Sequence, residues 1–130
     1  MPEAPDLEVV KDLLNQRVMG QVVEEARVLK PLELRVLTPT DLPQDIAGRS
    51  FTGFSRRGKF LLMELSDGRV LVVNPMLTGA LQLCSPSERL ARKTSFLFSL
   101  SGGMELRYLD ETQMGAAYYI DSSQVEQVPR

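Results

Sequence analysis

The chain has 130 residues, of which 43% are hydrophobic and 25% charged, a composition that indicates one compact domain with a single core. Its 15 Lys and Arg residues and 17 Asp and Glu residues give a net charge of −2, which argues against an affinity for nucleic acid or membrane that depends on bulk charge. The chain has no histidine and a single cysteine, Cys84, which excludes a zinc site of Cys and His ligands, a histidine base and an internal disulfide.

The first predicted element is an amphipathic helix from Pro5 to about Val18. Its apolar stripe has three- and four-residue spacing and consists of Leu7, Val10, Leu14 and Val18. We expect Val9 and Leu13 to widen this stripe. Pro5 is suited to the first turn, and Gly20 is placed to end the helix.

After the helix the pattern changes to short apolar runs separated by turn residues, which is typical of β-strands. The turns "SDG" at 66–68 and "SGG" at 101–103 predict hairpins, and "LPQDIAG" at 42–48 predicts a helical turn. The polar segment "CSPSERLARKTS" at 84–95 predicts a loop or a short helix. About eight strands after one helix predict a mainly β fold with flanking helices, namely a two-layer β-sandwich on which the N-terminal amphipathic helix packs. We expect residues 1–130 to form a single domain.

The sequence carries no sign of a membrane or export segment. No apolar stretch approaches the roughly 18 residues of a membrane span, and the acidic, proline-bearing start is unlike a basic signal peptide. We therefore expect a cytoplasmic protein without membrane contact. Cys84 continues an apolar run and has no histidine to activate it, so we predict a buried, inert thiol. The polar tail that ends in Pro129 and Arg130 predicts that the parent protein continues further.

The N-terminal "MPEAPD" allows two interpretations. If Met1 is removed, Pro2 presents a secondary amine, and an α-amino group with a pKa of roughly 7.7–8.0 is in part unprotonated and nucleophilic at neutral pH. Such an amine can attack an aldehyde-level carbon and form an iminium ion, and Glu3 could serve as the general acid or base. The alternative, which these residues alone favour, is a rigid, acidic start of the helix. If Met1 is retained, the Pro2 nitrogen is an amide and the nucleophile is absent.

Two further segments carry candidate binding residues. "RRGKFLLMEL" places Arg56, Arg57 and Lys59 just before an apolar strand, where cations can bind phosphate oxygens. The alternative is a charged edge that blocks sheet pairing. "NPMLTGALQL" places Met76 and Leu77 in a loop between two strands, where apolar side chains can wedge into a base stack, although core packing is the commoner fate.

Four segments, in order and spacing, resemble the formamidopyrimidine-DNA glycosylase and endonuclease VIII family. "MPEAPDLEVV" resembles its Met-Pro-Glu-x-Pro-Glu start, and "RRGKFLLMEL" resembles its basic hairpin that ends in lysine. "NPMLTGALQL" resembles its Gly-Met-Ser-Gly-x-Leu loop, and "SGGMELRYLDETQMGAAYY" its Leu-Arg-Tyr-x-Asp-Pro-Arg-Arg-Phe-Gly stretch. The resemblance covers essentially all 130 residues and implies the family's N-terminal catalytic domain, a β-sandwich flanked by helices.

The resemblance implies base-excision DNA repair by a bifunctional DNA glycosylase and AP lyase. Such an enzyme flips a damaged nucleotide out of double-stranded DNA, releases an oxidised base and nicks the strand by β,δ-elimination. By position, Pro2 would be the nucleophile that forms a Schiff base at C1′ of the deoxyribose, and Glu3 its acid–base partner. Lys59 would contact phosphate and assist at the lesion, and Leu77 would fill the space left by the flipped base.

The expected DNA-contacting residues depart in part from the family pattern. Thr112 and Met114 stand where an arginine and a phenylalanine complete the wedge, and Asp6 stands where a second glutamate is usual. Leu77 replaces the wedge methionine of the enzymes that remove oxidised purines. Leu77 and the Gly58–Lys59 pair favour the endonuclease VIII branch, so the damaged base stays open. The side chains that we expect to contact DNA are Arg56, Arg57, Leu77, Thr112 and Met114.

The family's C-terminal helix-two-turns-helix and zinc domains have no counterpart in these 130 residues. No metal or other cofactor is therefore expected in this chain, and zinc would belong to the absent domain. Much of the grip on phosphate would also come from that half, so we expect the isolated domain, as a monomer, to bind damaged DNA poorly and to be inactive. Two alternatives stay open: a non-catalytic DNA-binding or relic domain of the same ancestry, and an unrelated β-sandwich interaction module.

Overall fold

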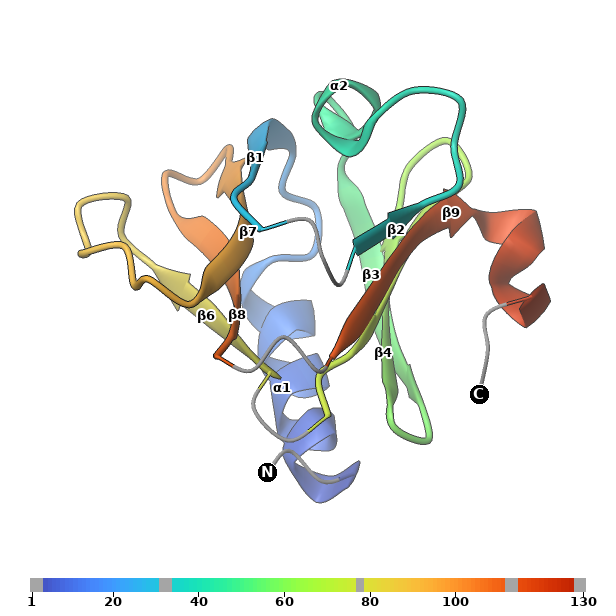
Figure 1. Ribbon diagram of the computed structural model, residues 1–130, viewed down its shortest axis with the longest axis horizontal. Helices are drawn as coiled ribbons and strands as arrows, with labels where there is room; N and C mark the ends of the chain where they lie inside the picture. The colour runs from blue at the N-terminus through green and yellow to red at the C-terminus, as the bar shows by residue number, and fades with distance from the viewer. Residues whose placement is uncertain (1–3, 31–33, 77–78, 112–114, 128–130) are drawn as a thin grey trace.

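The computed structural model describes residues 4–30, 34–76, 79–111 and 115–127. Within these ranges the chain folds into two β-sheets that face one another, with the N-terminal helix beside them (Figure 1). This arrangement confirms the predicted sandwich. None of the helices in this part of the chain is long and apolar enough to cross a membrane.

Helix α1, Ala4–Arg17, lies where the sequence predicts it but has a narrower apolar stripe. Its buried side chains follow the predicted spacing and include Leu7, Leu14 and, just after the helix, Val18. Val9 and Leu13 are 67% and 43% exposed, so the prediction that they widen the stripe is wrong. The reason is that α1 packs mainly against strand β3, Phe51–Arg57, at the edge of one sheet. An edge covers a narrower arc of a helix than a sheet face does.

Asn15 joins α1 to this edge strand. Its Nδ2 donates to the Phe54 carbonyl oxygen and its Oδ1 accepts the Phe54 N–H, and both hydrogen bonds are 3.0 Å long. Strand β3 is the outermost strand of its sheet, and the outward backbone groups of an edge strand have no strand partner. The Asn15 amide therefore takes the place of a further strand at this point.

The two sheets differ in strand order and direction. The antiparallel four-stranded sheet has the order β1 (Val23–Val28), β7 (Thr94–Leu100), β8 (Glu105–Asp110) and β6 (Gly79–Cys84). The five-stranded sheet has the order β2 (Leu34–Val36), β9 (Ala116–Asp121), β5 (Arg69–Asn74), β4 (Phe60–Leu65) and β3. Strand β2 runs parallel to β9. The described chain has nine strands, where about eight were expected.

The predicted turns have the expected backbone geometry. The turn between β4 and β5 has Asp67 and Gly68 at φ angles of 61° and 77°, the left-handed values of a tight hairpin. The turn between β7 and β8 has Gly103 at φ 93°. The helical turn is α2, Leu42–Ile46, and the Asp41 side chain caps it by accepting a backbone N–H at 3.0 Å.

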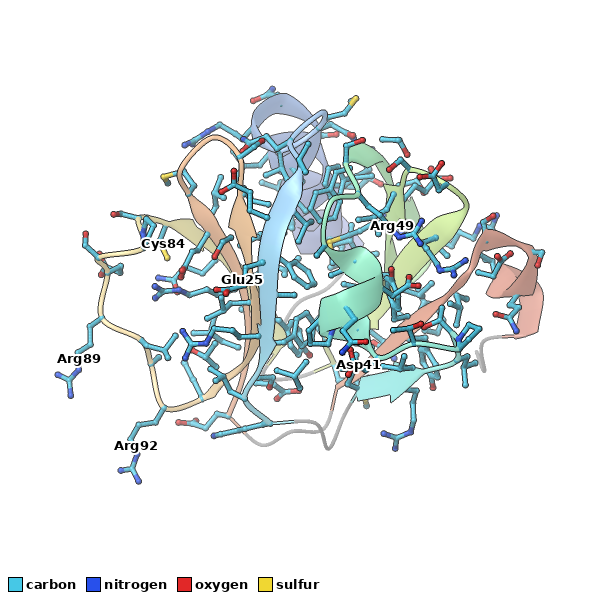
Figure 2. All side chains as sticks on the ribbon, turned by 90° about the horizontal axis from the view of Figure 1, so that it is seen from above. Glu25, Asp41, Arg49, Cys84, Arg89 and Arg92 are labelled. Carbon is cyan, nitrogen blue, oxygen red and sulfur yellow. The ribbon has the colours of Figure 1, made fainter. Side chains whose placement is uncertain are left out.

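The polar segment between β6 and β7 is a loop. Arg107 of β8, which is 2% exposed, holds this loop by donating to the carbonyl oxygens of Glu88 and Arg89 at 3.0 and 3.3 Å. Figure 2 shows Arg89 and Arg92 extending from the loop away from the sheets. Cys84, the last residue of β6, is half-buried rather than buried, and desolvation raises the pKa of its thiol. This direction agrees with the predicted inertness.

The main core lies between the two sheets. It is built around the aromatic rings of Phe51, Phe54, Phe96, Phe98 and Tyr108. The Phe96 and Tyr108 rings stack with their centroids 5.2 Å apart. A smaller apolar cluster of β4, β5 and β9 residues lies on the other face of the five-stranded sheet, beside the 3-10 helix η1, Ser122–Gln127.

The Asp45 carboxylate attaches α2 to the five-stranded sheet. It accepts hydrogen bonds from Arg69 Nε at 2.8 Å and from the Tyr119 hydroxyl at 2.6 Å, and it forms an ion pair with Arg49 at 3.3 Å. Burial opposes ionisation of Asp45. The hydrogen bonds from Arg69 and Tyr119 outweigh this effect and, together with the charge of Arg49, keep the pKa of the carboxyl below its ordinary value.

Candidate functional site

One end of the sandwich brings together the segments that carry the predicted site residues. The start of α1, the β3–β4 hairpin, and the strand ends that are joined by two inter-sheet connections all lie at the lower end of the molecule in Figure 1. These connections lead from β5 to β6 and from β8 to β9. Helix α1 begins at Ala4, directly after Pro2 and Glu3 in the chain. Stretches far apart in the sequence therefore meet at one end of the fold.

Five of the predicted site residues lie outside the described residues, and their roles stay predictions: Pro2, Glu3, Leu77, Thr112 and Met114. The described residues next to them in the chain are Ala4, Met76, Gly79, Glu111 and Gly115.

The β3–β4 hairpin presents cations at this end. Arg57 lies opposite Phe60 in the strand register, and Gly58 and Lys59 form the tip, with Gly58 at the left-handed φ of 58°. Lys59 is exposed, and its Nζ lies 6.0 Å from the centroid of the Phe60 ring. Arg57 is exposed as well. The tip therefore exposes Arg57 and Lys59 on the side of the molecule where α1 begins.

Arg56 has a different environment from these two cations. Its Nε donates to Glu8 Oε1 at 2.6 Å and its Nη1 donates to the Gly58 carbonyl oxygen at 2.7 Å. Glu8 also pairs with Lys11 at 3.0 Å. The hydrogen bonds from Arg56 and Lys11 lower the pKa of the Glu8 carboxyl. Arg56 thus braces the hairpin against α1, and its predicted contact with DNA stays a prediction.

Glu8 is a residue of this end that the sequence argument missed. Its spacing from Lys11 is a readable signal for a pair on one helix face. Its contact with Arg56 spans 48 positions of the chain, however, and nothing local in the sequence indicates it.

The β5–β6 connection begins with an exposed apolar side chain. Met76 is 41% exposed and has a φ of 54°, a left-handed conformation that non-glycine residues rarely adopt. The Gly79 N–H donates to the Pro75 carbonyl oxygen at 2.9 Å and closes the connection. Met76 is thus on the surface directly before Leu77 in the chain, as expected for an apolar loop tip.

Two hollows adjoin this end. The larger, of about 460 Å³, lies beside the hairpin tip and is lined by Arg57, Lys59 and apolar residues of β4, β5 and η1. The smaller, of about 120 Å³, lies under α1 and is lined by Leu7, Tyr108 and other mainly apolar residues. Among the described residues, neither lining contains a carboxylate. The described residues also contain no group of three side chains suited to hold a metal ion.

The chain matches the family model of the formamidopyrimidine-DNA glycosylase N-terminal domain over residues 1–117. A formamidopyrimidine-DNA glycosylase from Moorella thermoacetica is 36% identical over 129 residues, which make up 99% of this chain and 47% of the relative. The protein of the same name from Pelotomaculum thermopropionicum is 32% identical over 126 residues, or 97% of this chain and 46% of the relative. The chain spans about half the length of the curated relatives it matches.

Solved structures of Lactococcus lactis Fpg have the same fold. The complex of that protein with DNA containing an abasic site aligns with a TM-score of 0.87 and 26% identity, over 96% of this chain and 46% of the solved one. Its complex with DNA containing FAPY-dG gives the same TM-score and identity. The family resemblance inferred from the sequence is confirmed: the chain belongs to the formamidopyrimidine-DNA glycosylase family and corresponds to its N-terminal domain.

Proposed function

We propose that this chain supplies the N-terminal catalytic half of a DNA glycosylase with AP lyase activity, which removes oxidised bases from double-stranded DNA. The observation that carries the proposal is the meeting, at one end of the sandwich, of the α1 start, the cationic hairpin tip and the strand ends to which two inter-sheet connections attach. Membership of the family supports it. The solved complexes of Lactococcus lactis Fpg with damaged DNA support it as well.

The proposed reaction begins with the amine of Pro2. Its lone pair forms a bond to C1′ of the deoxyribose while the bond from C1′ to the damaged base breaks, and the base leaves with that electron pair and takes up a proton from solvent. The Glu3 carboxylate accepts the proton that the Pro2 nitrogen loses. Glu3 then donates a proton to the ring oxygen, so that the sugar ring opens and an iminium ion joins Pro2 to C1′. Loss of a proton from C2′ expels the 3′ phosphate, and a second elimination expels the 5′ phosphate. Water hydrolyses the iminium and restores the amine.

Helix α1 favours this chemistry by its direction. Pro2 and Glu3 precede its first residue, and the N-terminal end of a helix carries partial positive charge. A positive end disfavours protonation of a nearby amine and favours an ionised carboxyl. Both effects support a free amine at Pro2 and a carboxylate at Glu3 before the reaction begins.

The remaining assignments concern the grip on DNA. Lys59 and Arg57 would neutralise phosphates beside the lesion, since both are exposed at the hairpin tip. Leu77, in the β5–β6 connection, would fill the space of the flipped nucleotide. Thr112 and Met114, in the β8–β9 connection, would complete that wedge.

The other half of such a protein would complete the site. With a net charge of −2 and about half the length of its relatives, this chain would need further phosphate contacts from that half, which would also hold any zinc. The same observations, with Thr112 and Met114 at wedge positions, favour a second candidate function: a non-catalytic DNA-binding domain of the same ancestry. A cytoplasmic, monomeric state remains a prediction.

Borohydride trapping separates the two functions. Borohydride reduces the iminium to a stable amine, which links the protein covalently to DNA that contains an abasic site. We expect an adduct from the full-length protein when mass spectrometry shows that Pro2 is its first residue. The form that retains Met1 is the matched control, because only its terminal amine differs. If the Pro2 form gives no adduct with either duplex or single-stranded abasic DNA, the lyase is rejected.

Glu3→Gln then tests the acid–base role. If Glu3 transfers protons, this change should lower the rate of base excision far more than the affinity for damaged duplex. Equal losses of rate and affinity would show that Glu3 only stabilises the start of the helix.

A further inference from the structure

The two inter-sheet connections are attached side by side at the end of the sandwich that carries the proposed site. In the four-stranded sheet Gly79, where β6 begins, lies opposite Asp110, where β8 ends. In the five-stranded sheet Asn74, where β5 ends, lies opposite Ala116, where β9 begins. The connections therefore start and finish on neighbouring strands in both sheets.

Tyr108 and Asp110 of β8 fill the space between these attachment points. Both residues are 0% exposed. Asp110 Oδ2 accepts the Gly115 N–H at 2.8 Å and the Tyr108 hydroxyl at 3.2 Å. Asp110 therefore holds the far end of the β8–β9 connection and orients the hydroxyl of Tyr108.

The positions of Gly79 and Gly115 show how closely both connections approach that hydroxyl. A methyl group at Gly79 would lie 2.5 Å from Tyr108 Oη, and one at Gly115 would overlap the same atom. Real Cβ atoms do not come this close to their neighbours, so glycine is needed at both places. One hydroxyl group thus lies against the backbone of both connections.

We propose that Tyr108 and Asp110 form a clamp that sets the spacing of the two connections, and that both are positioning residues for the DNA contacts. The inference rests on the proposed function, in which Leu77 belongs to one connection and Thr112 and Met114 belong to the other. A wedge assembled from two separate connections works only when their separation is held constant.

The chemistry of the pair argues against a role in stability alone. A carboxylate is costly to desolvate, and an apolar side chain in the core of a sandwich commonly stabilises the fold as well or better. Asp45, at the other end of the molecule, receives two arginines and attaches a helix. Asp110 accepts a backbone N–H of a connection. The location of Asp110 is therefore suited to positioning the β8–β9 connection.

The test compares borohydride trapping on duplex and on single-stranded abasic DNA. The trapping rate on single-stranded DNA depends on the Pro2 amine and needs no wedge. The trapping rate on duplex DNA depends on both the amine and the wedge. For Asp110→Ala we expect a duplex rate lower by about tenfold or more, with the single-strand rate within about twofold of wild type. Tyr108→Phe should also lower the duplex rate more than the single-strand rate. Asp110→Asn keeps an oxygen for the Gly115 N–H and should recover most of the duplex rate.

Asp45→Ala is the matched control. It removes a carboxylate that also accepts a tyrosine hydroxyl, at the α2 end of the fold, so it should lower thermal stability and leave the ratio of the two rates unchanged. Equal losses on both substrates for Asp110→Ala, or an unchanged duplex rate, would overturn the clamp.

Hydrogen exchange of the backbone amides tests the clamp in the absence of DNA. A failure of the clamp can therefore be distinguished from a failure of the proposed function. If the wild type traps neither substrate, the proposed function fails while the exchange experiment still decides the clamp. Asp110→Ala should speed exchange of the Gly79 and Gly115 amides together, and Asp45→Ala should leave both unchanged. Faster exchange at Gly115 alone, the amide that loses its direct acceptor, would show that the two connections are not coupled.

Discussion

Arg56 Nε donates a 2.6 Å hydrogen bond to Glu8 Oε1, and this contact links the cationic hairpin to helix α1. The same guanidinium donates to the Gly58 carbonyl oxygen at the hairpin tip. The two hydrogen bonds therefore hold Lys59, the next residue, at a fixed position relative to helix α1, which follows Pro2 in the chain. The pair thus connects the proposed phosphate contact to the proposed nucleophile.

Glu8→Ala should loosen the hairpin without unfolding the domain. The two side chains are 42% and 26% exposed, so solvent screens the pair and the thermal midpoint should change little. Hydrogen exchange at residues 57–60 should become faster. Asp12→Ala is the matched control, because Asp12 pairs with Lys11 rather than with Arg56. Equal acceleration by both variants would contradict the bracing role of Glu8.

Asn15→Ala should destabilise the protein more than its partly exposed position suggests. The substitution leaves the N–H and the carbonyl oxygen of Phe54 without their partner at a strand edge. Two such groups imply a loss of about 1–3 kcal/mol in the free energy of unfolding, measured by urea denaturation. Gln16→Ala, at the exposed next position of the helix, should change it far less. Similar losses in both variants would mean that the paired hydrogen bonds contribute nothing specific.

Helix α1 shows which part of the fold was predictable. The spacing of Leu7, Leu14 and Val18 is a local property, and the residues of the "SDG" turn form a local signal as well, so the sequence predicted the helix and the hairpin. Val9 and Leu13 were placed wrongly because periodicity does not reveal how wide a surface covers a helix.

The contacts that shape the candidate site could not be predicted. Glu8 meets Arg56 across 48 positions, and that meeting depends on which strand becomes the sheet edge. Asp110 and Arg107 are charged residues of a strand, and such residues usually indicate a solvated face. Both are buried here because the fold gives them partners. The Gly115 N–H donates to Asp110, and Arg107 donates to the Glu105 carboxylate and the Glu88 carbonyl oxygen.

Acid should weaken the attachment of α2 through Asp45. The folded-state pKa of this carboxyl lies below its ordinary value of about 3.9, so its stabilising effect is complete above that pH and is lost as the pH falls through the folded-state pKa. Asp45→Asn should lower the free energy of unfolding at pH 7 by about 3 kcal/mol, because two arginines lose their anionic partner. Thermal melts between pH 7 and pH 2 should show a shallower acid loss in Asp45→Asn. Parallel curves would exclude Asp45 as the titrating group.

Lys59→Ala should weaken binding to abasic duplex DNA and lower the dependence of log K on log salt by about one phosphate contact. Lys59→Arg keeps the charge and should retain the slope. Arg92→Ala is the matched control, since Arg92 extends from the loop between β6 and β7, away from the hairpin (Figure 2). Titrations at several salt concentrations give the slopes. An unchanged slope for Lys59→Ala would remove this residue from the DNA interface.

Gly115→Ala should lower the free energy of unfolding by overpacking, by about 1–3 kcal/mol. The new methyl group would overlap the Tyr108 hydroxyl and lie 2.7 Å from Asp110 Oδ2 and 2.8 Å from the Asn74 carbonyl oxygen. Adding Tyr108→Phe removes one of these three clashes.

The double variant should therefore be more stable than the sum of the two single changes predicts, although below wild type. Gly53→Ala is the matched control, because a methyl there meets only Glu64 Oε2 at an ordinary 3.7 Å and should cost little. Urea denaturation of the four proteins in the cycle, wild type included, measures the coupling. Strict additivity would mean that the Tyr108 hydroxyl is not the atom that requires glycine at position 115, since only contact between the two groups makes their effects depend on each other.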